Sequence, residues 1–158
     1  MYQRILVPVD GSTTSTFGLD EAIKLAKLTG ASLRLIHVVD ALTLTTSLVP
    51  YAYYSGEVPP RAKEVGEQIL EQARTRVAAS GVKVDTFLFD SLLPRVSETV
   101  IEQAKAWNAD LIVIGTHGRR GVGRVLLGSD AEQIVRMAPV PVLLVRAPEV
   151  EGKADVMV

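Results

Sequence analysis

Short apolar runs alternate with helix-like segments along most of this chain, and this alternation limits the folds open to it. The apolar runs span residues 4–9, 32–39, 83–89, 110–115 and 142–145. Strands that alternate with helices favour a parallel sheet with helices on both faces, joined by right-handed crossovers. We therefore expect an α/β fold built on a doubly wound, five-stranded parallel sheet.

The segments between these runs repeat apolar residues every three or four positions, as amphipathic helices do. The expected apolar faces are Leu19, Ala22, Ile23 and Ala26; then Val65, Ile69, Ala73 and Val77; then Val96, Val100, Ala104 and Trp107. The Ser and Thr residues at 12–16 are candidate N-caps for the first helix, which should end at Gly30. Pro94 suits the first turn of the third helix, and the last helix should begin near Ser129.

Length, composition and charge limit the kinds of protein that this chain can be. A length of 158 residues fits one domain, expected at 1–147, followed by a flexible C-terminal tail at 148–158. The formal net charge of −1 argues against a nucleic-acid partner. There are no cysteines, which excludes disulfides and thiolate metal sites. No apolar run approaches the roughly 20 residues that span a bilayer, and the start of the chain lacks a signal-peptide layout, so we expect a cytoplasmic protein with no membrane contact.

The strand order that best suits such a chain is 3-2-1-4-5, and it predicts where a ligand would bind. In this order the runs at 4–9 and 110–115 are neighbours, and the winding of the sheet reverses between them. Ligands of open α/β sheets bind at such a switch point, at the carboxyl ends of the strands. The lips of the expected crevice are residues 8–10 and the loop that follows Gly115.

That loop is GTHGRRGVGRVLLGS, residues 115–129, with five glycines and three arginines. Glycine lets backbone N–H groups approach an anion closely, and a helix N-terminus adds a partial positive charge. Arg119, Arg120 and Arg124 can add charge, and Ser129 can either cap the helix or bind a phosphate oxygen. The loop therefore favours a phosphate group as its ligand; the plainer interpretation is a flexible surface turn with a solvated arginine face.

Two common phosphate motifs do not fit this loop. Gly121 and Gly123 lack the third glycine of the dinucleotide fingerprint, and neither P-loop spacing is followed by the required lysine. The spacing that matches is G-x2-G-x9-G-S, at Gly115, Gly118, Gly128 and Ser129. It resembles the nucleotide-binding signature of the universal stress protein family. RILVPVDGS near the start and APVPVLLVR near the end also resemble that family, so the likeness covers residues 2 to 146.

The resemblance implies a Rossmann-like fold of the adenine nucleotide alpha hydrolase type, and a role in the stress response. It implies a homodimer formed through the last strand, at about Val142–Val145, and binding of ATP, or of ADP or AMP, with Mg²⁺ as a possible companion. Asp10 would contact the ribose or a nearby polar edge, and the backbone of Val38 would contact the adenine edge. The complete set of implied nucleotide-binding residues is Pro8, Val9, Asp10, Val38, Ile114, Gly115, His117, Gly118, Arg119, Gly128, Ser129 and Asp130.

Asp130 departs from the family pattern, which usually has a small or apolar residue there. Its carboxylate favours the helix start but repels a triphosphate unless a metal intervenes, so ATP and AMP both remain open. Asp10 has the alternative role of capping the first helix. His37 is expected to be a packed core histidine, whereas His117 is either a ligand contact or an exposed loop residue.

Two kinds of function stay open. We favour a nucleotide-binding regulatory module, in which a Gly115→Val change should fill the crevice and leave the fold intact. The alternative is a nucleotide-free dimeric interaction protein of the same fold, acting through the long connection at 40–60. No catalytic constellation is recognisable, so any ATP hydrolysis should be slow.

Overall fold

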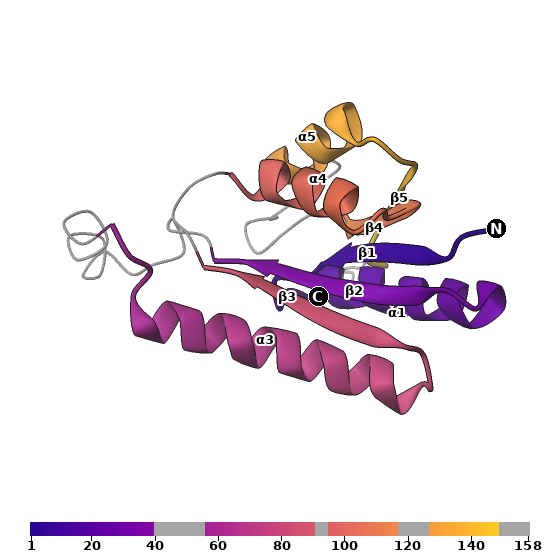
Figure 1. Ribbon diagram of the computed structural model, residues 1–158, viewed down its shortest axis with the longest axis horizontal. Helices are drawn as coiled ribbons and strands as arrows, with labels where there is room; N and C mark the ends of the chain where they lie inside the picture. Colours follow the sequence, from indigo (N-terminus) through magenta and orange to yellow (C-terminus); the bar gives the residue numbers. More distant parts are fainter. Residues whose placement is uncertain (40–55, 91–94, 117–126, 149–158) are drawn as a thin grey trace, which may run out of the picture.

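The five strands of the protein form one parallel sheet in the order β3-β2-β1-β4-β5 (Figure 1). The computed structural model describes residues 1–39, 56–90, 95–116 and 127–148. The strands are β1 (Arg4–Pro8), β2 (Ser32–Val38), β3 (Val84–Phe89), β4 (Leu111–Gly115) and β5 (Val142–Val145). The helices are α1 (Thr13–Thr29), α3 (Pro60–Ala79), α4 (Val96–Ala106) and α5 (Ser129–Met137). The predicted fold class and strand order are confirmed, and most strand ends agree within one residue.

Strand β1 is the centre of the sheet because it pairs in parallel with β2 on one edge and with β4 on the other. Its residues Ile5, Leu6 and Val7 are fully buried. A strand covered on both faces needs a continuous apolar run rather than an alternating one. This is why the uninterrupted run at the start of the sequence folds as the innermost strand.

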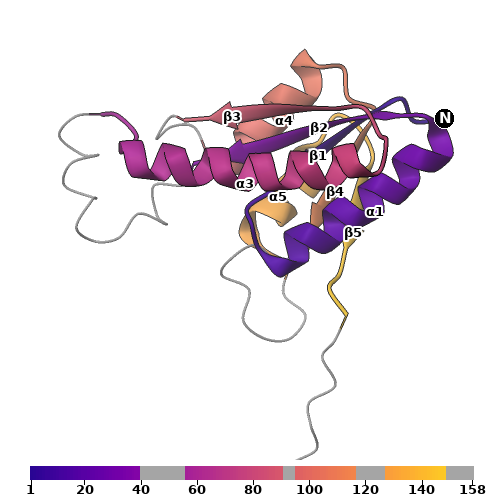
Figure 2. The same cartoon turned by 90° about the horizontal axis from the view of Figure 1, so that it is seen from below.

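Helices cover both faces of the sheet. Helices α1 and α3 lie against one face, and α4 and α5 lie against the other (Figures 1 and 2). Alternate residues of β1 serve the two cores: Ile5 and Val7 pack on the α1 and α3 side, and Leu6 packs on the α4 and α5 side. Within the described residues, none of these helices is both long and apolar enough to cross a membrane.

The predicted apolar face of α3 is partly wrong. Val65 is 37% exposed, whereas the buried residues of this helix are Gly66, Leu70, Ala73 and Val77. Residues spaced four apart advance about 40° beyond one full turn at each step, so a stripe of that spacing winds around the helix and leaves the sheet. The buried set alternates steps of four and three and therefore stays on one face.

Other predictions for the helices have mixed outcomes. The apolar face of α1 is confirmed, with Ser12 as its N-cap and Gly30 as its C-cap in the left-handed conformation. The apolar face of α4 is confirmed: Val100 and Ala104 are buried, and Trp107, which is the C-cap of the helix, packs partly buried against the same core. Pro94, most of the 40–60 connection and residues 149–158 of the predicted tail lie outside the described residues.

Helix α1 approaches β4 very closely, at two glycines that face each other. A Cβ on Gly18 would lie 3.2 Å from the backbone nitrogen of Gly115, and a Cβ on Gly115 would lie 2.9 Å from the carbonyl oxygen of Thr14. The side-chain position of Gly115 therefore points at α1 and not into the crevice. We therefore expect Gly115→Val to strain the contact between β4 and α1, in addition to any effect on a ligand.

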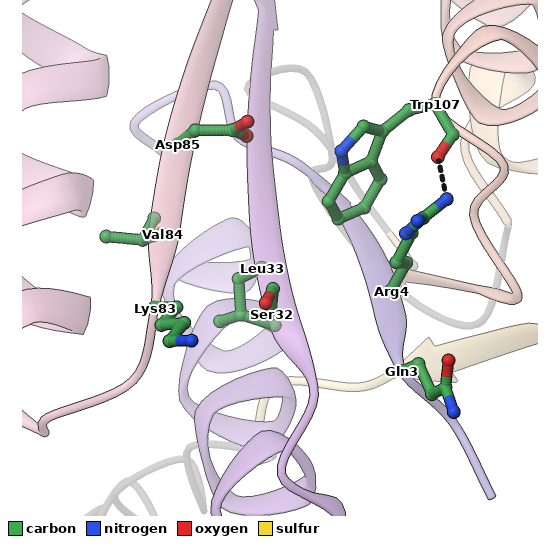
Figure 3. Close-up of a pocket in the computed structure, with 8 residues that line it drawn as sticks. All are labelled: Gln3, Arg4, Ser32, Leu33, Lys83, Val84, Asp85 and Trp107. Carbon is green, nitrogen blue, oxygen red and sulfur yellow. Dashed lines mark hydrogen bonds between the residues drawn. The ribbon is translucent and has the colours of Figure 1, made fainter.

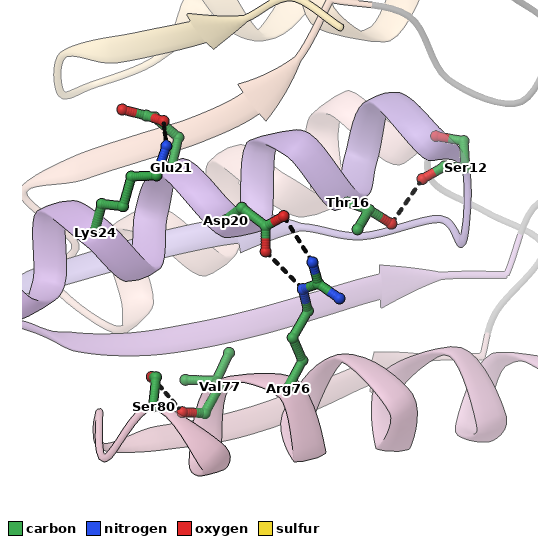
Figure 4. Close-up of polar contacts among 8 residues, drawn as sticks. All are labelled: Ser12, Thr16, Asp20, Glu21, Lys24, Arg76, Val77 and Ser80. Atoms are coloured by element: carbon green, nitrogen blue, oxygen red, sulfur yellow. Dashed lines mark hydrogen bonds and ion pairs between the residues drawn. The ribbon is translucent and has the colours of Figure 1, made fainter.

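An ion pair joins the two helices of this face. The guanidinium of Arg76 on α3 donates two hydrogen bonds to Asp20 on α1, at 2.6 and 2.7 Å (Figure 4). The Asp20 carboxylate raises the pKa of Arg76 through these bonds. Because both side chains are about a third exposed or more, the pair orients the helices more than it stabilises them.

We predict that Gly115→Val lowers the free energy of unfolding by about 1–3 kcal/mol, the usual cost of forcing extra atoms into a packed contact. The added Cβ would press on backbone atoms of α1, which cannot rotate away. Urea unfolding followed by circular dichroism measures the change. Thr13→Val, an exposed position on the same turn of α1, is the control and should stay within about 0.5 kcal/mol of the wild type. Equal stability of both variants would contradict the close contact.

Candidate functional site

The carboxyl ends of β1 and β4 lie side by side, and two helices begin there. Ile5 pairs with Leu111 and Leu6 with Ile112, so Pro8 and Gly115 end their strands at the same edge of the sheet. Helix α1 starts soon after Pro8, and α5 starts after the loop that follows Gly115. Both helix N-termini therefore turn their partial positive charge toward this edge, which suits an anion.

The turn between β1 and α1 is built from hydrogen bonds that hold Asp10 in place. One carboxylate oxygen of Asp10 accepts the N–H of Ser12 at 2.8 Å, and the N–H of Asp10 donates to the Ser15 hydroxyl at 3.2 Å. The Ser12 hydroxyl accepts the N–H of Ser15 at 3.1 Å and caps the helix. Thr16 adds a hydrogen bond to the Ser12 carbonyl (Figure 4). Ser12 is thus the cap, and the alternative that Asp10 caps α1 is wrong; Asp10 instead forms the turn before the helix.

The buried side chain of His37 forms a hydrogen bond to the backbone of Val9, the residue that precedes Asp10. Its Nδ1 lies 2.7 Å from the carbonyl oxygen of Val9, and the ring is 9% exposed. Since a carbonyl only accepts, Nδ1 must carry the proton. Helix α3 passes directly over the ring at Gly66, where a Cβ would lie 2.9 Å from Cδ2 of His37. The prediction of a packed, hydrogen-bonded core histidine is confirmed.

Thr116 ties the end of β4 to its neighbours and was missed in the sequence. Its N–H donates to the carbonyl of Val145 at 3.0 Å, and its carbonyl accepts the N–H of Gly128 at 2.8 Å. These bonds bring the last residue before α5 back to the end of β4. Thr116 is only 7% exposed. The signal in the sequence was a polar residue directly after an apolar strand.

The structure at the start of α5 tests one of the two roles predicted for Ser129, which were to cap the helix or to bind a phosphate oxygen. The N-cap of α5 is Gly128, which has no side chain to cap with, and Ser129 is the first residue inside the helix. Ser129 is exposed, and so is Asp130 beside it. The role of Ser129 as a helix cap is therefore wrong, and a role in binding a ligand stays a prediction.

The predicted site residues divide between the two faces of the sheet. Val38 and Ile114 pack in the core on the α4 and α5 side, and Pro8 faces the same way because it lies two residues after Leu6. Val9 packs on the opposite side, where Gly115 also meets α1. Of these two groups, only Pro8, Val38 and Ile114 can direct side chains toward a ligand on the α5 side of the sheet. His117, Gly118 and Arg119 lie outside the described residues.

Carboxylates give the start of α5 a negative character. Asp130 and Glu132 lie in its first turn, and Glu132 accepts a hydrogen bond from Arg136 at 2.9 Å. Within the described ranges, no three His, Asp or Glu side chains gather as ligands for a metal ion. The described part of the edge thus offers helix N-termini, the Asp10 turn and an apolar face.

Comparison of the chain with known protein families identifies the family to which it belongs. The model of the universal stress protein family matches residues 1–146. The chain belongs to the universal stress protein family. It is 33% identical over 156 residues to universal stress protein MJ0531 of Methanocaldococcus jannaschii, covering 96% of this chain and 86% of that one. It is 32% identical over 151 residues to universal stress protein YxiE of Bacillus subtilis, covering 92% of this chain and all of the other.

Solved structures share the fold. A universal stress protein from Burkholderia pseudomallei is 32% identical, with a TM-score of 0.69 over 92% of this chain and 97% of that one. Two more distant universal stress proteins were solved in complex with nucleotides, one with cAMP and one, from Archaeoglobus fulgidus, with dAMP. Each has a TM-score of 0.63, at 24% and 20% identity, and covers at least 91% of this chain and 97% of its own.

We predict that Ser12→Ala lowers the free energy of unfolding by about 1 kcal/mol, because it removes the cap that α1 uses. Ser129→Ala is the matched control. It should change stability by less than about 0.5 kcal/mol, since this side chain is exposed and does not cap α5. Thermal and urea unfolding of both variants measure the difference. A larger loss for Ser129→Ala than for Ser12→Ala would contradict the assignment of the caps.

Proposed function

We propose that this universal stress protein is a regulatory module that binds an adenine nucleotide at the carboxyl edge of β1 and β4. The observation that carries the proposal is the convergence of the α1 and α5 N-termini at the edge where the winding of the sheet reverses. The G-x2-G-x9-G-S spacing, which begins at Gly115 and ends at Ser129, supports it from the sequence. The cAMP and dAMP complexes of two relatives support the class of ligand.

In the proposed complex, each part of the nucleotide has its own surface. The adenosine would lie against Pro8, Val38 and Ile114, which share one face of the sheet. Asp10 would bind the ribose, because its turn and the Val9–His37 hydrogen bond hold it at the lip of the crevice. Gly115 and Val9 would act through their backbone.

The phosphate end would meet the start of α5, through Gly128, Ser129 and Asp130, together with His117, Gly118 and Arg119 of the preceding loop. Backbone N–H groups at the helix start attract the anion, while the carboxylates of Asp130 and Glu132 oppose a high negative charge. We infer that the site prefers a monophosphate, or ATP when Mg²⁺ offsets its charge.

We also propose that the protein is a homodimer formed through β5. This strand ends the sheet order, so one of its edges is open for pairing with a second copy. Leu143 and Leu144 of β5 are each 37% exposed, and Val135 and Met137 of α5 are 45% and 56% exposed. Partly exposed apolar side chains on an edge strand and the nearby helix fit a second copy of the same chain.

We predict that Asp10→Asn weakens nucleotide binding about tenfold or more, the loss expected when a charge-assisted hydrogen bond to the ribose is removed. Asparagine keeps the oxygen that accepts from Ser12, so the turn and the fold should survive. Isothermal titration with AMP, and with ATP and Mg²⁺, measures the affinity, and mass spectrometry of denatured protein identifies any nucleotide carried from the cell. Glu102→Gln, an exposed change on α4, is the control. A wild-type protein that binds neither nucleotide would favour the alternative of an interaction protein.

We predict that Leu144→Glu converts a dimer to a monomer, because it places a charge on the apolar edge of β5. Sedimentation velocity of the wild type and the variant gives the result directly. Leu28→Glu is the control: this residue is 81% exposed on α1, far along the chain from β5, and should leave the dimer intact. A monomeric wild type, or a dimer that survives Leu144→Glu, would rule out this interface.

A further inference from the structure

A second hollow lies at the opposite edge of the sheet, at the amino-terminal ends of β1, β2 and β3. It is a depression that is open to solvent, with a volume of about 390 Å³. The side chains that matter here are Arg4, Ser32, Lys83, Asp85 and Trp107 (Figure 3). The sheet separates this hollow from the carboxyl edge, so the two candidate sites do not overlap.

The hollow lies on the face of the sheet that α4 and α5 cover, next to Trp107 at the end of α4. The strand register places Arg4 beside Ser32 and Arg34 beside Asp85 on that face. Polar side chains therefore occupy the amino ends of these strands on the α4 side.

The indole of Trp107 is held in position by a contact with Arg34. The guanidinium of Arg34 lies 4.8 Å from the centre of the ring, in cation–π contact. Arg34 in turn donates two hydrogen bonds to Asp85, at 2.8 and 2.6 Å, and this carboxylate raises the pKa of Arg34. Asp85 is therefore already paired with Arg34. The Trp107 ring is already ordered by its contact with Arg34, so a ligand that packs on it costs little side-chain entropy.

Two cations line the hollow without a carboxylate partner. In the part of the chain that the structure describes, neither Arg4 nor Lys83 takes part in an ion pair, and both are exposed. One Nη of Arg4 donates to the backbone carbonyl oxygen of Trp107 at 3.2 Å, which holds the guanidinium beside this residue (Figure 3). The nearby carboxylate of Asp110 accepts the N–H groups of Gln3 and Arg4, at 2.7 and 3.1 Å, and so holds the start of β1.

We propose that this hollow is a second ligand site, for a small molecule that joins a flat ring to one anionic group, phosphate or carboxylate. The ring would pack against the part of Trp107 that lines the hollow and that Arg34 leaves uncovered. The anion would bind the guanidinium of Arg4, the ammonium of Lys83 and the hydroxyl of Ser32. Arginine forms paired hydrogen bonds with both kinds of anion, and lysine adds a point charge. Such a site would let a second small molecule act on a protein that binds its nucleotide at the other edge.

Trp107 is the only tryptophan of the chain, so its fluorescence reports on this hollow alone. The full-length protein is titrated with phenyl phosphate, with phenylacetate and with inorganic phosphate. We expect a saturable change with at least one of the two ring ligands, and the better of them identifies the anion. Inorganic phosphate should bind about tenfold more weakly or worse, because it lacks the ring. No saturable change with either ring ligand, or equal binding of inorganic phosphate, would overturn the proposal.

Variants test which residues hold the ligand. The double change Arg4→Gln and Lys83→Gln should weaken binding about tenfold or more, the loss expected for charge-assisted contacts. Lys105→Gln, an exposed change on α4 near the same ring, is the matched control and should bind as the wild type does. If the double variant proves unstable, Lys83→Gln alone must weaken binding in the same direction. An equal loss in Lys105→Gln would reduce the effect to overall charge and overturn the proposal.

The fluorescence test of the second hollow does not depend on whether the protein binds a nucleotide. Ser129→Ala changes the carboxyl edge only, so it should leave the fluorescence titration unchanged. Failure of the ring ligands to bind, in a protein that still binds AMP, would therefore count against the second hollow alone.

Discussion

The pairing of β1 with both β2 and β4 is the constraint on which the rest of the molecule depends. It buries Ile5, Leu6 and Val7 completely and sets the point where the winding of the sheet reverses. Strands β2 and β3 extend the sheet on one side of β1, and β4 and β5 extend it on the other. Because parallel crossovers are right-handed, this change of direction places α1 and α3 on one face and α4 and α5 on the other. The two cores, the two helical layers and the position of the candidate crevice all follow from this pairing.

The crevice is framed by short-range hydrogen bonds and by close packing. On one lip, Asp10 and Ser12 form the turn into α1 while His37 holds the carbonyl of Val9. On the other, Thr116 connects β4 to β5 and to the residue before α5. Gly18 and Gly115 let α1 and β4 meet without side chains between them. The glycine signature therefore includes a packing glycine, at Gly115, as well as residues that can face a phosphate.

The two edges of the sheet differ in what they offer. At the carboxyl edge, the starts of α1 and α5 provide backbone N–H groups and a partial positive charge. At the amino edge, the ring of Trp107 at the end of α4, two cations and a hydroxyl line the hollow. An adenine nucleotide suits the first edge by its phosphate, and an anionic ring compound suits the second by its flat face and its charge. The two proposed sites thus lie at opposite ends of the strands.

The sequence by itself determined the class of fold and the strand order, through the alternation of strands and helices along the chain. It determined the C-cap of α1 and the buried role of His37, and it limited the N-cap of α1 to the Ser and Thr residues at 12–16, because capping chemistry acts within a few residues. It also determined the family, through the ends of the chain and the glycine spacing. It did not determine that Val65 leaves the core of α3, since a spacing of four does not reveal where the stripe drifts off the sheet. Only the tertiary structure decided that Gly115 points at Thr14, that Thr116 joins β4 to α5, and that Trp107 lies over Arg34. Each of these contacts joins segments distant in the chain, and their geometry depends on how layers pack rather than on any local pattern.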